Sequence, residues 1–143
     1  MKLKEEKRDL FSVDDKYYLA HCISDDFALG AGIAVEFANR YNMRLELRKR
    51  YSDGIGGVGC VLIGNVFNLI TKEKYYHKPT YMNLRISLEK MKKIILENGI
   101  NYLAMPLIGC GLDNLEWDKV KIIIEEVFCD VDIEILVCYL QHK

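Results

Sequence analysis

Residues 17–41, YYLAHCISDDFALGAGIAVEFANRY, contain the pattern that decides the fold. The first seven, Tyr17–Ile23, form a short and mostly apolar run that predicts a buried strand. The polar residues Ser24–Asp26 end this run. Gly30–Gly32 then lead into Ile33–Tyr41, which we predict to be a helix. A strand that passes through a polar, glycine-containing loop into a helix is a unit from which α/β proteins are built.

The rest of the chain alternates further predicted strands and helices. The longest predicted helix ends at Gly99, a residue type that is typical of helix C-termini. Two of the strands are joined by Gly64-Asn65, a hairpin turn signal. The further helices predicted are Met43–Arg50, Thr80–Asn98 and Trp117–Phe128, and the further strands are Cys60–Ile63, Val66–Thr71, Ile100–Met105 and Val131–Tyr139. This order predicts one α/β domain over residues 1–143, with helices on both faces of its sheet.

Length, charge and cysteine content narrow the class of protein. A chain of 143 residues is long enough for one domain with a substantial core. Its formal net charge is −1, so no overall positive field draws it to nucleic acid. No apolar stretch approaches the ~20 residues that span a bilayer, and the charged segment Met1–Arg8 is not a secretory signal. The 5 cysteines are odd in number and widely spaced, which predicts reduced thiols in a cytoplasmic protein rather than disulfides or a zinc site.

Two glycine-containing loops follow predicted strands. Ser24–Gly32 follows the first strand, and Leu107–Asp113 follows the strand that ends at Met105. Ligands of α/β sheets gather at the carboxyl ends of strands, where both loops are expected. Glycine lets backbone N–H groups approach an anion, and a helix N-terminus adds a favourable dipole. Either loop alone could be an ordinary tight turn, whereas together they could clamp a diphosphate from both sides.

Ionisable side chains stand beside these loops. Lys72 directly follows an apolar run, where a desolvated amine can become a nucleophile, although a lysine at a strand end is usually a solvated charge. Asp113 closes the second loop as a general acid/base or ribose ligand, or simply as an acid near a helix N-terminus. Cys110 has no assignable histidine partner and is interpreted as a small loop residue. His21 lies within a predicted strand, which favours a hydrogen-bonded residue of the core.

The order of several short motifs resembles the macrodomain family. The motifs are His21–Asp26, Gly30–Val35, Leu69–Lys72, His77–Tyr81, Met105-Pro106 and Ile108–Asp113, and they occur in this order. Together they resemble the branch of the terminal ADP-ribose protein glycohydrolase, also called O-acetyl-ADP-ribose deacetylase. The resemblance runs from about residue 7 to residue 140. It implies a three-layer α/β/α fold with a central mixed sheet and ADP-ribose lying across the strand ends.

The resemblance also implies roles for individual residues. Lys72 would be the catalytic nucleophile and Asp113 the acid/base, with no metal or cofactor required. Ser24 stands where most macrodomains carry an asparagine, while Arg8 and Leu107 replace a glycine and an arginine that the family pattern has there. The residues implied to bind ADP-ribose are Asp9, Leu10, His21, Ser24, Gly30, Ala31, Gly32, Ile33, Leu107, Ile108, Gly109, Cys110, Gly111, Leu112 and Leu140.

Three functions are compatible with this resemblance. The first is a hydrolase that removes ADP-ribose from acyl esters, namely ADP-ribosyl-glutamate or -aspartate and O-acetyl-ADP-ribose. The second is a reader that binds ADP-ribose without chemistry, and the third is a hydrolase acting on ADP-ribosylated DNA bases. A reader needs neither Lys72 nor Asp113, and the near-neutral charge disfavours a nucleic-acid partner. We therefore expect ADP-ribose, or an ADP-ribosylated protein or small molecule, as the partner, with no role for a membrane.

Overall fold

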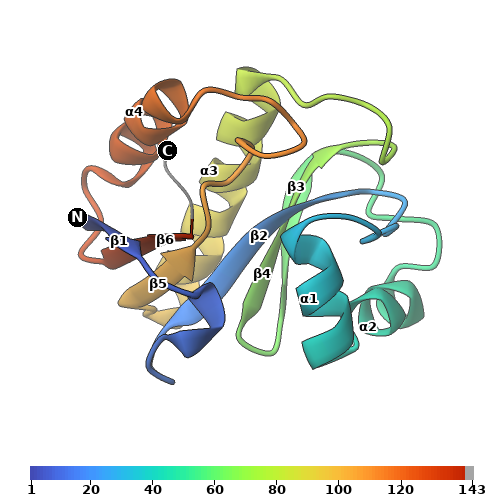
Figure 1. Cartoon of the computed structure of the whole chain (residues 1–143), viewed down its shortest axis with the longest axis horizontal. Coiled ribbons are helices and arrows are strands. Elements are labelled where there is room, and N and C mark those ends of the chain that lie inside the picture. Colours follow the sequence, from blue (N-terminus) through green and yellow to red (C-terminus); the bar gives the residue numbers. More distant parts are fainter. Residues whose placement is uncertain (141–143) are drawn as a thin grey trace.

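A computed structural model describes residues 1–140 as a six-stranded sheet between two layers of helices (Figure 1). The strand order is β1-β6-β5-β2-β4-β3, and all neighbours are parallel except β3, which runs antiparallel to β4. The strands are β1 (Lys2–Lys7), β2 (Tyr18–Ser24), β3 (Gly59–Ile63), β4 (Val66–Lys72), β5 (Tyr102–Met105) and β6 (Glu134–Tyr139). The helices are the 3-10 turn η1 (Leu10–Ser12), α1 (Ile33–Tyr41), α2 (Met43–Arg50), α3 (Tyr81–Asn98) and α4 (Trp117–Phe128). The predicted mixed α/β sheet is confirmed.

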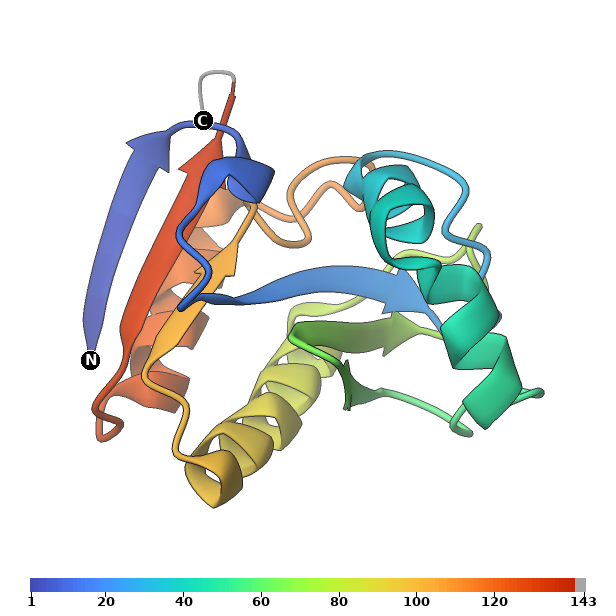
Figure 2. The ribbon, with the colours of Figure 1, turned by 90° about the horizontal axis from the view of Figure 1, so that it is seen from below.

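Each helical layer closes its own hydrophobic core against one face of the sheet (Figure 2). Successive residues of β4 point to opposite faces, so that Phe67 and Leu69 join the core under α3 and α4, while Ile70 joins the core under α1 and α2. Phe37 of α1 and Leu47 of α2 are fully buried there. Burial of such side chains, at ~1.5–3 kcal/mol each, fixes the helices on the sheet.

The boundaries of the helices agree closely with the sequence patterns. The ends of α1, α2 and α4 are those predicted, and α3 begins after Thr80, whose hydroxyl accepts a hydrogen bond from the backbone N–H of Asn83 at 3.0 Å. Gly99 ends α3 in the left-handed conformation, with φ 63°. The largest difference is at β6, which begins at Glu134 instead of Val131 because the preceding residues form hydrogen-bonded turns.

The sequence pattern does not predict β1. This strand pairs in parallel with β6 at the edge of the sheet. Leu3 is its only apolar residue, so it has no apolar run of the kind that indicates a buried strand. Its pairing with β6, rather than burial of its side chains, makes it a strand.

The topology opens a crevice at one edge of the sheet. β2 lies between β4 and β5, and the chain leaves β2 toward α1 on one face but leaves β5 toward α4 on the other. The two glycine loops therefore diverge at a topological switch point, which is where α/β sheets bind ligands. No helix within residues 1–140 is both long and apolar enough to cross a membrane.

Candidate functional site

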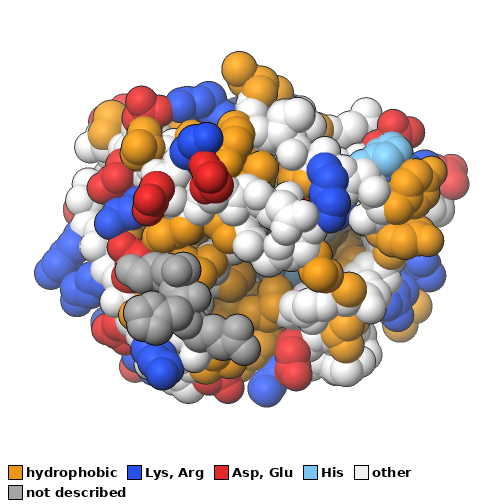
Figure 3. Space-filling model, turned by 45° about the horizontal axis from the view of Figure 1, so that its top comes forward, with side chains coloured by type: hydrophobic (Ala, Val, Ile, Leu, Met, Phe, Trp, Pro, Cys, Tyr) orange, Lys and Arg blue, Asp and Glu red, His pale blue; other side chains and the backbone are white. Residues whose placement is uncertain are grey.

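A cleft of about 1200 Å³ occupies this edge of the sheet. Figure 3 shows this face of the molecule, with a hollow across its middle and hydrophobic side chains along the hollow. The predicted ligand residues that line the cleft are Asp9, Leu10, Ser24, Gly30, Ala31, Gly32, Ile33, Leu107, Ile108, Gly109, Cys110, Gly111, Leu112 and Leu140. Lys72 and Asp113 line it as well, so residues from five separate segments of the chain meet around one space.

His21 does not line this cleft. It is fully buried, with Nε2 2.7 Å from Oδ1 of Asn68 and its ring stacked on Phe37 at a centroid distance of 3.9 Å. Burial lowers the pKa of His21 to about 4, and the hydrogen bond to Asn68 opposes that shift only in part. We therefore correct the ligand assignment of His21, which is a neutral residue of the core, as its place in a strand favours.

Asp25 anchors the glycine-rich loop that precedes β3. Its carboxylate is buried and accepts hydrogen bonds from the backbone N–H groups of Ile55, Gly56 and Gly57 at 2.7, 3.1 and 3.0 Å. Gly54 has φ +86°, and a Cβ atom at this position would lie 2.6 Å from the carbonyl oxygen of Asp25. The loop is therefore fastened closely to the end of β2.

Asp26 anchors a different loop. It accepts hydrogen bonds from the Ser24 hydroxyl at 2.5 Å and from the backbone N–H groups of Tyr75 and Ala28 at 3.0 and 3.2 Å. Burial alone would raise the pKa of Asp26, but these hydrogen bonds and the charge of Lys74 lower it overall. Because its hydroxyl proton is committed to Asp26, Ser24 can offer a ligand only an acceptor oxygen.

An arginine from α2 binds two backbone carbonyl groups of the first glycine loop. Arg44 donates from Nε and Nη2 to the carbonyl oxygen of Ala28 at 2.9 and 2.7 Å, and from Nη2 to that of Leu29 at 3.0 Å. Gly32 begins α1 at φ 61° with no side-chain cap. The first N–H groups of α1 therefore lack intrahelical acceptors and lie in the cleft wall, where the helix dipole favours an anion.

The second glycine loop requires glycine at one position. Gly109 has φ +73°, and a Cβ atom there would lie 2.9 Å from Cδ1 of Leu115. The loop is closed by a hydrogen bond from the backbone N–H of Leu115 to the carbonyl oxygen of Gly109 at 2.8 Å. Burial raises the pKa of the neighbouring Cys110 thiol to about 11, which agrees with a small loop residue rather than a thiolate.

Lys72 and Asp113 meet in the cleft. Nζ of Lys72, the last residue of β4, lies 2.7 Å from Oδ1 of Asp113, and each side chain is only 14% exposed. Lys72 pairs with Ser24 across a register shift at the end of β2, and its carbonyl oxygen accepts from the N–H of Asp25 at 2.9 Å. Burial, and then the charge of Asp113, raise the pKa of Cys22 beside the pair, so this thiol stays protonated.

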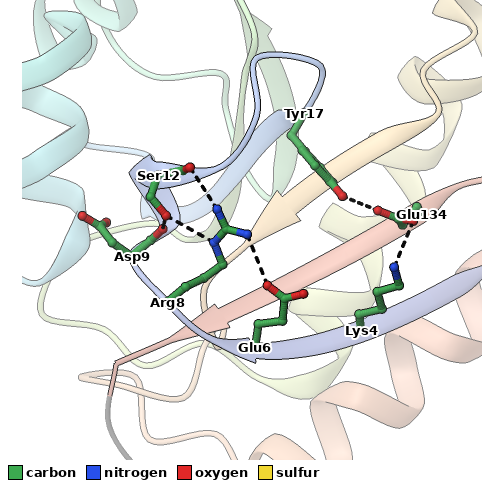
Figure 4. A network of polar contacts seen from close by, with 7 residues as sticks. All are labelled: Lys4, Glu6, Arg8, Asp9, Ser12, Tyr17 and Glu134. Atoms are coloured by element: carbon green, nitrogen blue, oxygen red, sulfur yellow. Dashed lines mark hydrogen bonds and ion pairs between the residues drawn. The ribbon is translucent and has the colours of Figure 1, made fainter.

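Arg8 organises the far end of the cleft (Figure 4). Its guanidinium donates to the hydroxyl and carbonyl oxygens of Ser12 at 3.2 and 2.9 Å and pairs with Glu6 at 3.3 Å. Asp9 caps η1 by accepting from the backbone N–H of Phe11 at 3.0 Å. Arg8, which stands where the family pattern has a glycine, thus fixes the turn that presents Asp9 and Leu10, which the resemblance implies to bind ADP-ribose.

The residues that organise the loops were not predicted from the sequence. Asp25 and Asp26 were interpreted only as the polar end of a strand, although two consecutive carboxylates at a strand end are themselves a signal. Arg44 gives no signal, because its acceptors are backbone carbonyl groups far away along the chain. Within residues 1–140, no group of three or more His, Cys, Asp or Glu side chains is placed to hold a metal ion.

Comparison with known proteins identifies relatives of this chain. The bovine and human proteins named ADP-ribose glycohydrolase OARD1 are 48% and 47% identical to it over 134 residues, which cover 92% of this chain and 87% of each relative. The macrodomain of Mycobacterium tuberculosis DarG superposes with a TM-score of 0.80 at 22% identity, covering 96% of this chain and 97% of that one. Thermosipho africanus DarTG in complex with ADP-ribose gives 0.76 at 16% identity, covering 96% of this chain and 41% of that one.

Sequence and fold lead to the same family. The solved structures share the fold, and the two relatives also share nearly half of the aligned residues. No family model matches the chain. The resemblance seen in the sequence is confirmed: the chain belongs to the macrodomain family, in the branch of ADP-ribose glycohydrolase OARD1.

Proposed function

We propose that Lys72 and Asp113 carry the chemistry of this ADP-ribose glycohydrolase, which removes ADP-ribose from acyl esters of glutamate or aspartate and from O-acetyl-ADP-ribose. The observation that supports this assignment is the 2.7 Å contact between the amine and the carboxylate inside the cleft. Both side chains are largely withdrawn from water, as a nucleophile and its proton acceptor need to be. A reader of ADP-ribose would gain nothing from such a pair.

In this proposal, the cleft orients ADP-ribose with its distal ribose at Lys72. The N–H groups at the start of α1 and the backbone of the second glycine loop hold the diphosphate from two sides. Asp9, Leu10 and Leu140, which follow β1 and β6 on the side of the sheet away from β4, receive the adenosine half in this proposal. A diphosphate fixed in this way positions the anomeric carbon of the distal ribose for attack.

The first chemical step forms a covalent adduct. The Lys72 ammonium passes a proton to Asp113 along the hydrogen bond that joins them. The free amine then attacks the anomeric carbon, so that a C–N bond forms while the C–O bond to the acceptor breaks. The electron pair of that bond leaves with the acceptor carboxylate, which is a good leaving group.

The second step returns the enzyme to its starting state. Asp113, now protonated, assists opening of the ribose ring, and water then hydrolyses the lysine adduct. The C–N bond breaks, the hydroxyl of water replaces the nitrogen, and the other proton of water goes to Lys72, which is released as an ammonium group. Asp113 gives up the proton that it took in the first step, which accounts for the acid formed. The net reaction consumes one water and yields ADP-ribose and a carboxylic acid, and the adduct divides one difficult step into two.

Turnover of O-acetyl-ADP-ribose and of an ADP-ribosyl-glutamate peptide tests this assignment. We expect Lys72→Ala to abolish turnover while ADP-ribose affinity stays within about tenfold, or ~1.4 kcal/mol. Borohydride reduction should trap an ADP-ribose adduct on the wild type and not on Lys72→Ala, and Asp113→Ala should slow both substrates. A wild type that binds ADP-ribose but hydrolyses neither substrate would be a reader, and retained turnover in Lys72→Ala would exclude the nucleophile.

The cytoplasmic location is part of the same proposal. It is supported by the cysteines, which are free thiols throughout and lie apart from one another in the sequence.

The acceptor can be a modified protein carboxylate or the acetyl group of a small molecule, and the two kinds of substrate differ in how much space they need beyond the ribose.

A further inference from the structure

A second hollow, of about 910 Å³, adjoins the ADP-ribose cleft. The two hollows share Lys72 and Lys78 in their walls. We propose that this second hollow, the acceptor groove, receives the polypeptide segment that carries the ADP-ribosylated carboxylate; this inference rests on the proposed function. Its walls are formed by Phe27, the glycine-rich loop between Ser52 and Val58, the loop of residues 73–78 and the start of α3.

The covalent structure of the substrate requires the acceptor to lie close to Lys72. In an ester of ADP-ribose, the acceptor oxygen is bonded directly to the anomeric carbon that Lys72 attacks. The acceptor chain therefore has to leave the cleft beside Lys72 at the end of β4, whereas Asp9 and Leu140 follow β1 and β6 on the other side of the sheet. The acceptor groove begins at Lys72, whereas an acetyl group is too short to reach far into it.

Two consecutive aspartates hold the opposite walls of the groove. Asp25 fastens the glycine-rich loop on one side through three backbone N–H groups, and Asp26 fastens the loop of residues 73–78 on the other through the N–H of Tyr75. Both follow directly on β2. Both walls are therefore fastened to residues at the end of the same strand, β2.

The glycine-rich wall leaves room for a second backbone. A Cβ atom at Gly56 or at Gly57 would meet no atom within 4 Å, and the two residues have φ +88° and +145°. Because neither position carries a side chain, an extended segment can approach the loop backbone closely. On the facing wall, Lys74 and His77 are exposed and offer polar groups to such a segment.

The charges in the groove favour a polypeptide over a nucleic acid. Within residues 1–140, neither Lys74 nor Lys78 forms an ion pair, although Lys74 is near enough to Asp26 to lower its pKa. Asp53 and Glu73 add exposed negative charge to the same hollow. A polypeptide can match both signs, whereas a nucleic acid brings an anion at every linkage. We infer that acidic residues next to the modified carboxylate face Lys74.

Charge reversal at Lys74 tests this groove, because Lys74 lies outside the ADP-ribose cleft. For Lys74→Glu, kcat/KM on an ADP-ribosyl-glutamate peptide with acidic neighbours should fall about tenfold, while kcat/KM on O-acetyl-ADP-ribose stays within twofold. A peptide with lysine neighbours should be turned over better by Lys74→Glu than by the wild type. Lys93→Glu, at an exposed position of α3, is the matched control and should leave both peptides unaffected.

A steric variant gives an independent measurement. Ser52→Trp places a large side chain at the exposed rim and should slow the peptide but not O-acetyl-ADP-ribose. Suppose that the wild type hydrolyses both substrates, and that Lys74→Glu and Ser52→Trp both have the wild-type kcat/KM on the peptide. The role of the acceptor groove is then overturned, while the proposed function stands. If Lys74→Glu lowers kcat/KM on an ADP-ribosylated oligonucleotide more than on the peptide, the proposal that the groove receives a polypeptide is overturned. If the wild type hydrolyses neither substrate, the proposed function fails, and the groove fails with it.

Discussion

Lys78, in the loop before α3, donates a hydrogen bond to the main-chain carbonyl oxygen of Leu112, the residue directly before Asp113. The loop that carries Lys78 follows Lys72 at the end of β4, whereas Leu112 belongs to the second glycine loop. One side chain therefore joins the two segments that supply the amine and the carboxylate of the cleft. Leu112 itself is 63% exposed, so packing does little to hold this part of the loop.

Removal of this hydrogen bond should slow the chemical step. Lys78→Met keeps most of the aliphatic stem but loses the donor, which leaves Asp113 less well placed over Lys72. A net loss of about 1 kcal/mol corresponds to roughly fivefold in kcat on O-acetyl-ADP-ribose. Lys78→Arg should recover most of the rate, since its guanidinium can still donate. A kcat equal to that of the wild type in Lys78→Met would contradict a positioning role.

Two glycines of the second loop should respond differently to the same substitution. Gly109→Ala strains a residue at φ +73° and brings Cβ to 2.9 Å from Leu115, so we expect a loss of ~1–3 kcal/mol in the free energy of unfolding and weaker binding of ADP-ribose. Gly111→Ala is the control, because its Cβ would meet nothing within 4 Å and its φ is not in the left-handed range. Urea denaturation and calorimetric titration measure both quantities, and equal effects at the two positions would refute the steric argument.

Asp25 should contribute more to the free energy of unfolding than Asp53, an aspartate within the glycine-rich loop. Asp25→Ala leaves three backbone N–H groups without their acceptor, which predicts a loss of about 2–3 kcal/mol in the free energy of unfolding. Asp53→Ala, at an exposed position, should change it by less than about 0.5 kcal/mol. Chemical denaturation compares the two variants. A similar small loss in both would mean that water replaces the amide contacts of Asp25 without cost.

His21 should make the protein less stable in weak acid. The pKa of His21 is lowered from 6.5 to about 4 in the folded chain, chiefly by burial. The unfolded chain therefore binds this proton first as the pH falls, and the free energy of unfolding should drop by about 2 kcal/mol between pH 7.5 and pH 5. In His21→Gln this share of the pH dependence should disappear. An unchanged pH dependence in the variant would assign it to other groups.

The sequence predicted most of the fold because apolar residues dominate its elements. The bounds of α1 and α4 follow from apolar residues at helical spacing and from glycine or polar residues at the ends, whereas α2 has only three apolar residues among its eight. β1 was not predicted, because an edge strand made mostly of charged residues has no apolar run. The start of β6 was placed too early because Val131 and Ile133 are apolar but lie in a turn that packs on the core.

The sequence predicted which residues line the candidate site but not the contacts that shape its loops. The glycine loops could be named from their positions after strands, and Lys72 and Asp113 were singled out by their resemblance to the macrodomain pattern; the topology explains why these segments converge. The contacts that shape the loops could not be named, because Asp25, Asp26 and Arg44 act on backbone groups whose positions depend on the whole fold. His21 was included through its place in a motif, although a residue in the middle of a strand points into a core rather than past the strand end.

The charged strand at the margin of the sheet has a consequence for how copies of this protein behave together. β1 carries lysine or glutamate at five of its six positions. Edge-to-edge pairing of two copies through β1 would crowd these side chains against each other and strip them of water. β1 is thus paired with β6 on one side, while the charges on the strand oppose the addition of a further copy of the protein on its open side.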